Sequence, residues 1–120
     1  MQGRKSEIMS QLQQIDNSTA NEVFRAVADP TRRALLDQLL KEDMPVMKLA
    51  ESFDMTLPAV SQHLKMLRSA GLVTERRQGR QRIYQLNPAP LKEVVDWIAH
   101  YDQFWRTRLN RLGEHLARNP

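Results

Sequence analysis

Three polar side chains lie close together between residues 61 and 65, namely Ser61, Gln62 and Lys65. A glutamine amide can pair with the edge of an adenine, a serine hydroxyl can bond to a base or a phosphate, and a lysine can reach phosphate or guanine. Apolar residues of the same segment recur at helical spacing, so the polar side chains share the opposite face of a helix. The residues that we predict to contact DNA from this segment are Thr56, Leu57, Pro58, Ser61, Gln62 and Lys65.

A second group of candidates surrounds a glycine a few residues later. Four arginines occur within seven residues, and the β-prone runs LVTERR and RQRIYQL flank Gln78-Gly79. This pattern predicts a β-hairpin over 72–86 with glycine at its turn. Such a hairpin can straddle phosphates, and an arginine at its tip can enter a minor groove. The candidates here are Arg76, Arg77, Gln78, Gly79, Arg80 and Arg82.

The net charge is concentrated in this part of the chain. The whole sequence has a net charge of +4, whereas the segment from Thr56 to Arg82 alone carries six basic residues and one acidic residue. The remainder is therefore nearly neutral. A surface for a polyanion that is confined to one segment would produce this asymmetry, so double-stranded DNA is the leading partner.

Composition also excludes several classes of protein. The 120 residues include no cysteine, so disulfides, thiolate metal sites and thiol switches are absent. No apolar run approaches the ~18–20 residues of a membrane span, and the N-terminal residues lack the apolar core of a secretory signal. Glycine-rich phosphate loops and triad-like sets are also missing, so we expect no enzyme and no membrane contact. We expect a cytoplasmic protein.

Helix signals precede the polar helix in regular order. The spacing predicts a short amphipathic helix within 1–19 and a second over about 20–28. Asp29-Pro30 is a helix start, and it opens a helix over 30–41 that faces inward with Leu35, Leu36, Leu39 and Leu40. Two helices joined by three residues follow within 46–70, capped by Thr56 and stopped by Gly71.

The final segment, within 88–118, is apolar at every third or fourth position. It predicts one helix of about 28 residues, or about 42 Å, including Trp97, Tyr101 and Trp105. One small domain cannot cover so long and aromatic a helix, so we expect a partner surface. The single domain 1–120 would thus be mainly α with a small β-hairpin, arranged as a winged helix-turn-helix.

Two stretches, FRAVADPTRRALLDQLL and LPAVSQHLKMLRSAGLVTERRQGRQRIYQL, resemble the ArsR/SmtB family of bacterial transcriptional repressors over about residues 20–87. WIAHYDQFWRTRLNRL is similar to the last helix of a subgroup without cysteine metal sites. The resemblance implies a homodimer formed by the first and last helices, an imperfect inverted repeat as operator, and repression relieved by a signal. The interface residues implied are Ile8, Leu12, Ile15, Trp97, Ile98, Tyr101, Phe104, Trp105, Leu109 and Leu112.

The sequence departs from the sensors of that family. Their zinc sites use Asp-x-His and His-x-x-Glu in the last helix, whereas Asp96 and His100 are four residues apart here and Glu114 directly precedes His115. We therefore predict no cofactor. A zinc site of Asp96 and His100 with His115 from a partner helix is the alternative. A soft-metal site of Met44, Met47 and Met55 is less favoured, because such methionines usually fill the core.

Some roles stay open at this point. His63 can be a packing residue or lie beside phosphate, and Arg32 and Arg33 can contact Glu22, Asp29, Asp37 or phosphate. A small organic inducer could bind between the aromatic surfaces of two copies. A rival function is a winged-helix module that binds another protein and has only weak, sequence-indifferent affinity for DNA.

Overall fold

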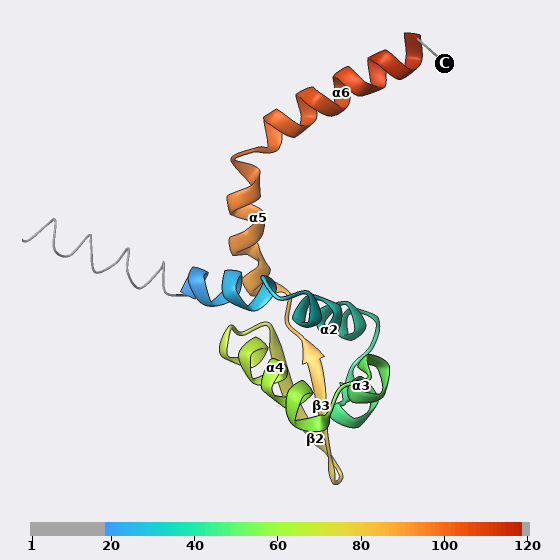
Figure 1. Cartoon of the computed structure of the whole chain (residues 1–120). Helices are drawn as coiled ribbons and strands as arrows, with labels where there is room; N and C mark the ends of the chain where they lie inside the picture. The colour runs from blue at the N-terminus through green and yellow to red at the C-terminus, as the bar shows by residue number, and fades with distance from the viewer. Residues whose placement is uncertain (1–18, 119–120) are drawn as a thin grey trace, which may run out of the picture.

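A computed structural model describes residues 19–118, and Figure 1 shows their arrangement. Residues 19–27 are helical. The elements that follow are α2 (Pro30–Lys41), β1 (Met44–Pro45), α3 (Val46–Phe53), α4 (Leu57–Ser69), β2 (Val73–Gln78), β3 (Gln81–Leu86), a 3₁₀ turn η1 (Ala89–Leu91), α5 (Lys92–Ala99) and α6 (Asp102–Arg118). The expected class, mainly α with a small β-hairpin, is confirmed. The interface candidates Ile8, Leu12 and Ile15 lie outside the described residues.

The predicted helix starts and stops are confirmed in atomic detail. Asp29 precedes α2, and its Oδ2 accepts a hydrogen bond from the Arg32 backbone N–H at 2.9 Å. Thr56 precedes α4, and its hydroxyl accepts from the Ala59 N–H at 3.3 Å. Each cap satisfies a donor that the first turn of a helix leaves free. Gly71 follows α4 with φ +77°, a conformation that glycine adopts without strain.

The strands form an antiparallel sheet in the order β1-β3-β2. β2 and β3 pair from Val73↔Leu86 to Gln78↔Gln81, so only Gly79 and Arg80 form the loop. Gly79 has φ +64° whereas Arg80 does not have a positive φ, which is the pattern of a type II′ turn. Met44-Pro45, which lies between the two predicted helices over 30–41 and from 46, adds β1 at the edge of the sheet, where proline is tolerated.

The core lies between the helices and the sheet. Its largest fully buried side chains come from the helical residues 19–27, α2, α3, α4 and the residue just before β2, and they are Val23, Leu35, Leu49, Val60, Leu64, Leu67 and Leu72. The expectation that Leu40 is buried is wrong, because 72 % of it is exposed. The buried face of α2 is centred on Leu35 and Leu39 and includes Arg32, so Leu40 lies beyond its edge in the last turn.

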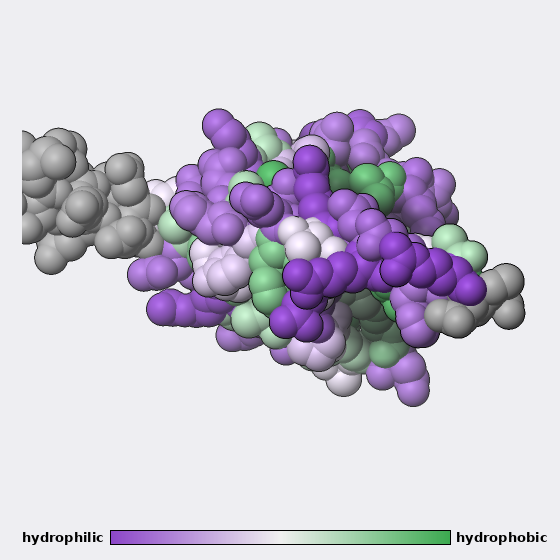
Figure 2. Space-filling view, turned by 90° about the horizontal axis from the view of Figure 1, so that it is seen from above, coloured by the Kyte–Doolittle hydropathy of each residue, from purple (hydrophilic) through white to green (hydrophobic). Residues whose placement is uncertain are grey.

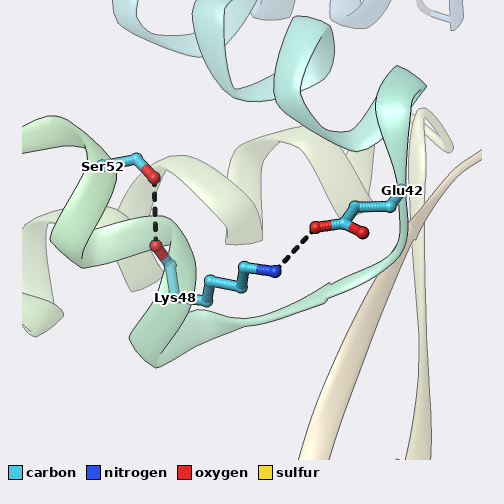
Figure 3. A network of polar contacts seen from close by, with 3 residues as sticks. All are labelled: Glu42, Lys48 and Ser52. Atoms are coloured by element: carbon cyan, nitrogen blue, oxygen red, sulfur yellow. Dashed lines mark hydrogen bonds and ion pairs between the residues drawn. The ribbon is translucent and has the colours of Figure 1, made fainter.

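A polar contact links the end of α2 to α3. The helix α3 is the first of the two helices that a three-residue turn joins. Lys48 Nζ donates to Glu42 Oε1 at 2.6 Å, and Ser52 Oγ donates to the Lys48 carbonyl at 3.2 Å (Figure 3). The hydrogen bond from Lys48 and its positive charge lower the pKa of the Glu42 carboxyl. Both side chains are more than half exposed, so this ion pair orients the connection more than it stabilises the fold.

The single final helix that we predicted is wrong. The chain breaks at His100-Tyr101, where the two N–H groups bond to carbonyls three residues earlier, those of Trp97 and Ile98, at 3.2 and 2.8 Å. These tighter bonds end α5, and Asp102 places a negative charge in the first turn of α6, which favours a new helix start. Figure 1 shows α6 leaving α5 at an angle, away from the rest of the fold. No helix in residues 19–118 has the length and apolarity of a membrane span.

Candidate nucleic-acid interface

The two-faced character predicted for α4 is confirmed. Val60, Leu64 and Leu67 are at most 1 % exposed and pack in the core. The opposite face is open to solvent, and its exposed residues are Thr56, Leu57, Pro58, Ser61, Gln62 and Lys65. Asp54, in the left-handed conformation at φ +49°, turns the chain between α3 and α4. The polar side chains are therefore displayed by a helix whose orientation is set by its buried face.

The four arginines of the hairpin separate into three positions. Arg77 and Arg82 are directly opposite each other on one face of the two strands. Arg76 lies on the other face, because successive side chains of a strand alternate, and its Nη2 is 3.5 Å from Asp43 Oδ2. Arg80 occupies the tip beside Gly79, and all four are exposed.

Ion pairs reduce the number of basic groups available to a ligand. Arg68 Nη1 lies 3.4 Å from Glu75 Oε1, and Arg76 is held near Asp43. In residues 19–118 no carboxylate lies within ion-pair distance of the other basic side chains of the segment 56–82. These uncompensated cations, on α4 and on the hairpin, are Lys65, Arg77, Arg80 and Arg82.

A hollow of about 520 Å³ separates α4 from β2, and residues between Lys65 and Glu75 line it. Tyr84 is the cross-strand partner of Glu75. Burial, and then the negative charge of Glu75, raise the pKa of the Tyr84 hydroxyl. Arg68 from α4 reaches the same carboxylate. The α4 helix and the hairpin are thus joined by side chains as well as by the chain.

Arg32 and Arg33 have roles that the sequence left open. Neither guanidinium binds a carboxylate of residues 19–118. Arg32 is buried and donates to the carbonyls of Arg25 and Ala26 at 2.8 and 2.7 Å, while Arg33 donates to those of Val27 and Ala28 at 2.8 and 3.2 Å. Both cap the end of the helical segment 19–27, whose free carbonyls attract cations. The signal available in the sequence was a pair of arginines four and five residues after the predicted end of a helix at residue 28.

The Asp29 cap predicts a dependence of stability on pH. Its hydrogen bond from the Arg32 N–H lowers the pKa of the Asp29 carboxyl below 3.8, burial opposes this, and the charges of Arg32 and His63 lower it further. A lowered folded-state pKa stabilises the fold above the unfolded value, and this contribution is lost as pH falls through the folded one. We expect Asp29→Asn, which keeps a capping oxygen, to be less stable than wild type near neutrality and to approach it towards about pH 3.

Urea denaturation of both proteins from about pH 6 to about pH 3 measures this convergence. Asp29→Ala is the control, because it lacks the cap and should stay below Asp29→Asn at every pH. A constant difference between wild type and Asp29→Asn would contradict the assignment.

The described part of a single chain does not assemble the zinc alternative. Among residues 19–118, no three histidine or acidic side chains lie together in a way that could hold a metal. Asp96 and His100 are on or just after α5, His115 is on α6, and His100 Nδ1 lies 3.2 Å from the Trp97 carbonyl oxygen. A zinc site completed by a partner's helix stays the alternative to the prediction of no cofactor.

Aromatic side chains remain exposed along α5 and α6. Trp97 contacts Phe24 edge-on, with ring centres 5.7 Å apart, and Tyr101 at 5.8 Å. Trp97 and Trp105 are nevertheless 52 % and 55 % exposed. Seen from above, hydrophobic and pale surfaces lie open between the hydrophilic ones (Figure 2). Exposed aromatic side chains that gather along one part of a small domain usually mark an interface.

Comparison with known proteins identifies the group to which this site belongs. Residues 29–75, which include α2, α3 and α4, match the family described as bacterial regulatory protein, arsR family. Transcriptional repressor SdpR of Bacillus subtilis is 37 % identical over 81 residues, which are 68 % of this chain and 90 % of that protein.

Solved structures agree with the sequence relatives. An ArsR family transcriptional regulator is 36 % identical and superposes with a TM-score of 0.67 over 75 % of this chain and 93 % of its own. A homodimeric winged helix-turn-helix DNA-binding domain from Mycobacterium bovis is 26 % identical, with a TM-score of 0.57 over 83 % of this chain and 88 % of its own. The chain therefore belongs to the arsR family of bacterial regulatory proteins and is a DNA-binding transcriptional regulator with a winged helix-turn-helix fold.

Proposed function

We propose that two copies of this chain form a repressor that binds an inverted-repeat operator in the bacterial cytoplasm, without a metal, another cofactor or a catalytic step. The observation that carries the proposal is the exposed polar face of α4, which lies beside a hairpin with uncompensated arginines. A major groove about 12 Å wide admits a helix of this kind. Gln62 and Ser61 would contact bases, and Lys65 would contact phosphate or guanine.

The hairpin supplies the contacts that do not depend on sequence. Arg77 and Arg82 present two cations on one face, and Arg80 extends from the tip. Arginines in these places suit the phosphates that flank the groove and the minor groove next to it. Because Arg76 and Arg68 lie near carboxylates, we assign them a smaller share of the binding.

The dimer is supported by the apolar surface of α5 and α6. Trp105, Leu109 and Leu112 are between 53 % and 63 % exposed in a single chain, and burying them requires a second surface. A relative of this fold is described as homodimeric, and another relative is named a repressor. Two-fold symmetry would place the centres of the two half-sites about 10 base pairs apart, or a multiple of that distance.

Selection from random duplexes tests this proposal. The selected duplex and a scrambled control are then titrated with the protein over a range of salt concentrations. We expect an inverted repeat that binds about 10³-fold or more tightly than the control. Equal affinities with the same steep salt dependence would show electrostatic attachment only, and would favour the rival module that binds another protein.

Two substitutions separate base reading from phosphate binding. We expect Gln62→Ala to change the preferred base at one position of each half-site, because its amide would no longer pair with an adenine edge. We expect Arg80→Ala to weaken binding to all duplexes alike and to make the salt dependence shallower. Repeating the selection and the titrations with each variant measures both effects. If both variants lower affinity uniformly, α4 does not read the bases.

A further inference from the structure

Arg32 joins two elements through one buried side chain. It is 9 % exposed and is the one buried charged residue within residues 19–118. Its Nε and Nη2 donate to the carbonyls of Ala26 and Arg25 at 2.7 and 2.8 Å. Its Nη1 faces α4, where it lies 3.4 Å from His63 Nδ1 and 3.5 Å from Met66 Sδ. One rigid guanidinium fork thus contacts the end of the helical segment 19–27 and α4 at the same time.

The same helical segment contacts α5. Phe24 immediately precedes Arg25 and Ala26, and its ring lies edge-on to Trp97 with centres 5.7 Å apart and planes at 88°. Trp97 in turn lies edge-on to Tyr101, two residues after α5. A ring contact, the backbone of residues 24–26 and the hydrogen bonds of Arg32 therefore connect the exposed aromatic surface of α5 to α4.

On α4, this series ends beside the face that we assign to DNA. His63 directly follows Gln62, and Met66 directly follows Lys65. A hollow of about 320 Å³ is lined jointly by Glu22 and Arg25 of the segment 19–27 and by residues of α4 that include Gln62, Lys65 and Met66. Because a helix moves as a rigid unit, a shift at His63 and Met66 displaces Gln62 and Lys65 as well.

We propose that Arg32 is a positioning residue for α4, through which the contact between Phe24 and Trp97 sets how tightly α4 binds its operator. The inference rests on the proposed function, and it adds a route of regulation. A molecule or a second copy of the chain that displaces Trp97 would act on DNA binding along this route without contacting DNA. The coupling between Arg32 and the contact of Phe24 with Trp97 must be measurable as an interaction free energy in operator binding.

A double-mutant cycle on the full chain tests the proposal. Arg32→Lys keeps the positive charge but cannot form the fork that joins both elements. Phe24→Leu keeps an apolar side chain but removes the ring contact with Trp97. Affinity is measured for the selected operator and for a scrambled duplex, at one salt concentration, with wild type, both single variants and the double variant.

We expect each single substitution to weaken operator binding about fivefold or more. We expect the double variant to bind the operator with at least the affinity of whichever single variant binds it less tightly. Affinity for the scrambled duplex should stay within about twofold, because it depends on exposed charge. Arg33→Lys is the matched control. Arg33 caps the same helical segment, but within residues 19–118 its side-chain hydrogen bonds go to Val27 and Ala28 and not to α4. We expect the losses of operator affinity caused by Arg33→Lys and by Phe24→Leu to multiply when the two substitutions are combined, because the two residues are not coupled through α4.

Three results would overturn the proposal. In the first, the losses of operator affinity caused by Arg32→Lys and Phe24→Leu multiply in the double variant. In the second, Arg33→Lys is coupled to Phe24→Leu as strongly as Arg32→Lys is. In the third, the variants lose as much affinity for the scrambled duplex as for the operator. If circular dichroism shows that Arg32→Lys does not fold, His63→Leu replaces it in the cycle, because it removes the contact from the α4 side. If the proposed function is wrong, the result is different, because wild type itself then binds the operator and the scrambled duplex with equal affinity.

Discussion

Replacing Leu109 with glutamate should convert the proposed dimer to a monomer and lower operator affinity by about 10² to 10⁴-fold. The second half-site is bound at the effective concentration that the dimer provides, and a monomer loses this advantage. Leu109 is 63 % exposed in the single chain, so the new charge is hydrated in the monomer and is costly only in the interface. Light scattering and operator titration measure the two effects.

The control for this substitution lies next to it. Asn110→Glu introduces the same charge on the adjacent residue of α6, away from the apolar stripe that contains Trp105, Leu109 and Leu112. We expect Asn110→Glu to remain dimeric and to lose only the small affinity that an added negative charge removes. A dimeric Leu109→Glu protein with wild-type affinity would show that α6 does not form the interface.

Truncating Leu64 should cause a large loss of stability. Leu64 is 1 % exposed, so Leu64→Ala loses buried apolar contacts and leaves a cavity, at a cost of about 2–5 kcal/mol. A small domain has a free energy of unfolding of only about 5–15 kcal/mol. Urea denaturation followed by far-ultraviolet circular dichroism measures the difference.

Leu57→Ala is the matched substitution on the other face of α4. Leu57 is 41 % exposed, so its truncation should cost far less stability, whereas it removes an apolar group that we assign to the DNA surface. We therefore expect the two variants to show opposite patterns, with stability lost in Leu64→Ala and operator affinity lost in Leu57→Ala. Similar losses of stability in the two variants would be inconsistent with the two faces described for α4.

Local signals in the sequence were sufficient to predict α2, α3 and α4. Asp29-Pro30 and Thr56 mark helix starts by bonding to free N–H groups, and Gly71 marks a stop by adopting a positive φ. These interactions involve residues at most a few positions apart, so they can be read along the chain. The division of α4 into a buried and an exposed face follows from helical spacing in the same way.

Features that depend on distant residues could not be predicted. β1 is two residues long and is a strand only because Met44 and Pro45 pair with Tyr84 and Ile83. Leu40 has the apolar character of its neighbours, but the packing of residues 19–118 leaves it mostly exposed. The contact of Arg32 with His63 joins residues that are 31 positions apart. The arginines of the hairpin were identified as a cluster, but their division between two faces required the strand register.

The register of the hairpin brings two arginines together. Arg77 and Arg82 are opposed across the two strands, so the free protein holds two like charges side by side. An anion placed between them is attracted by both and also screens their mutual repulsion. The hairpin therefore becomes more stable when it is bound than when it is free. Binding and folding of this small sheet are thermodynamically linked, and polyvalent anions in solution compete with DNA for the same relief of repulsion.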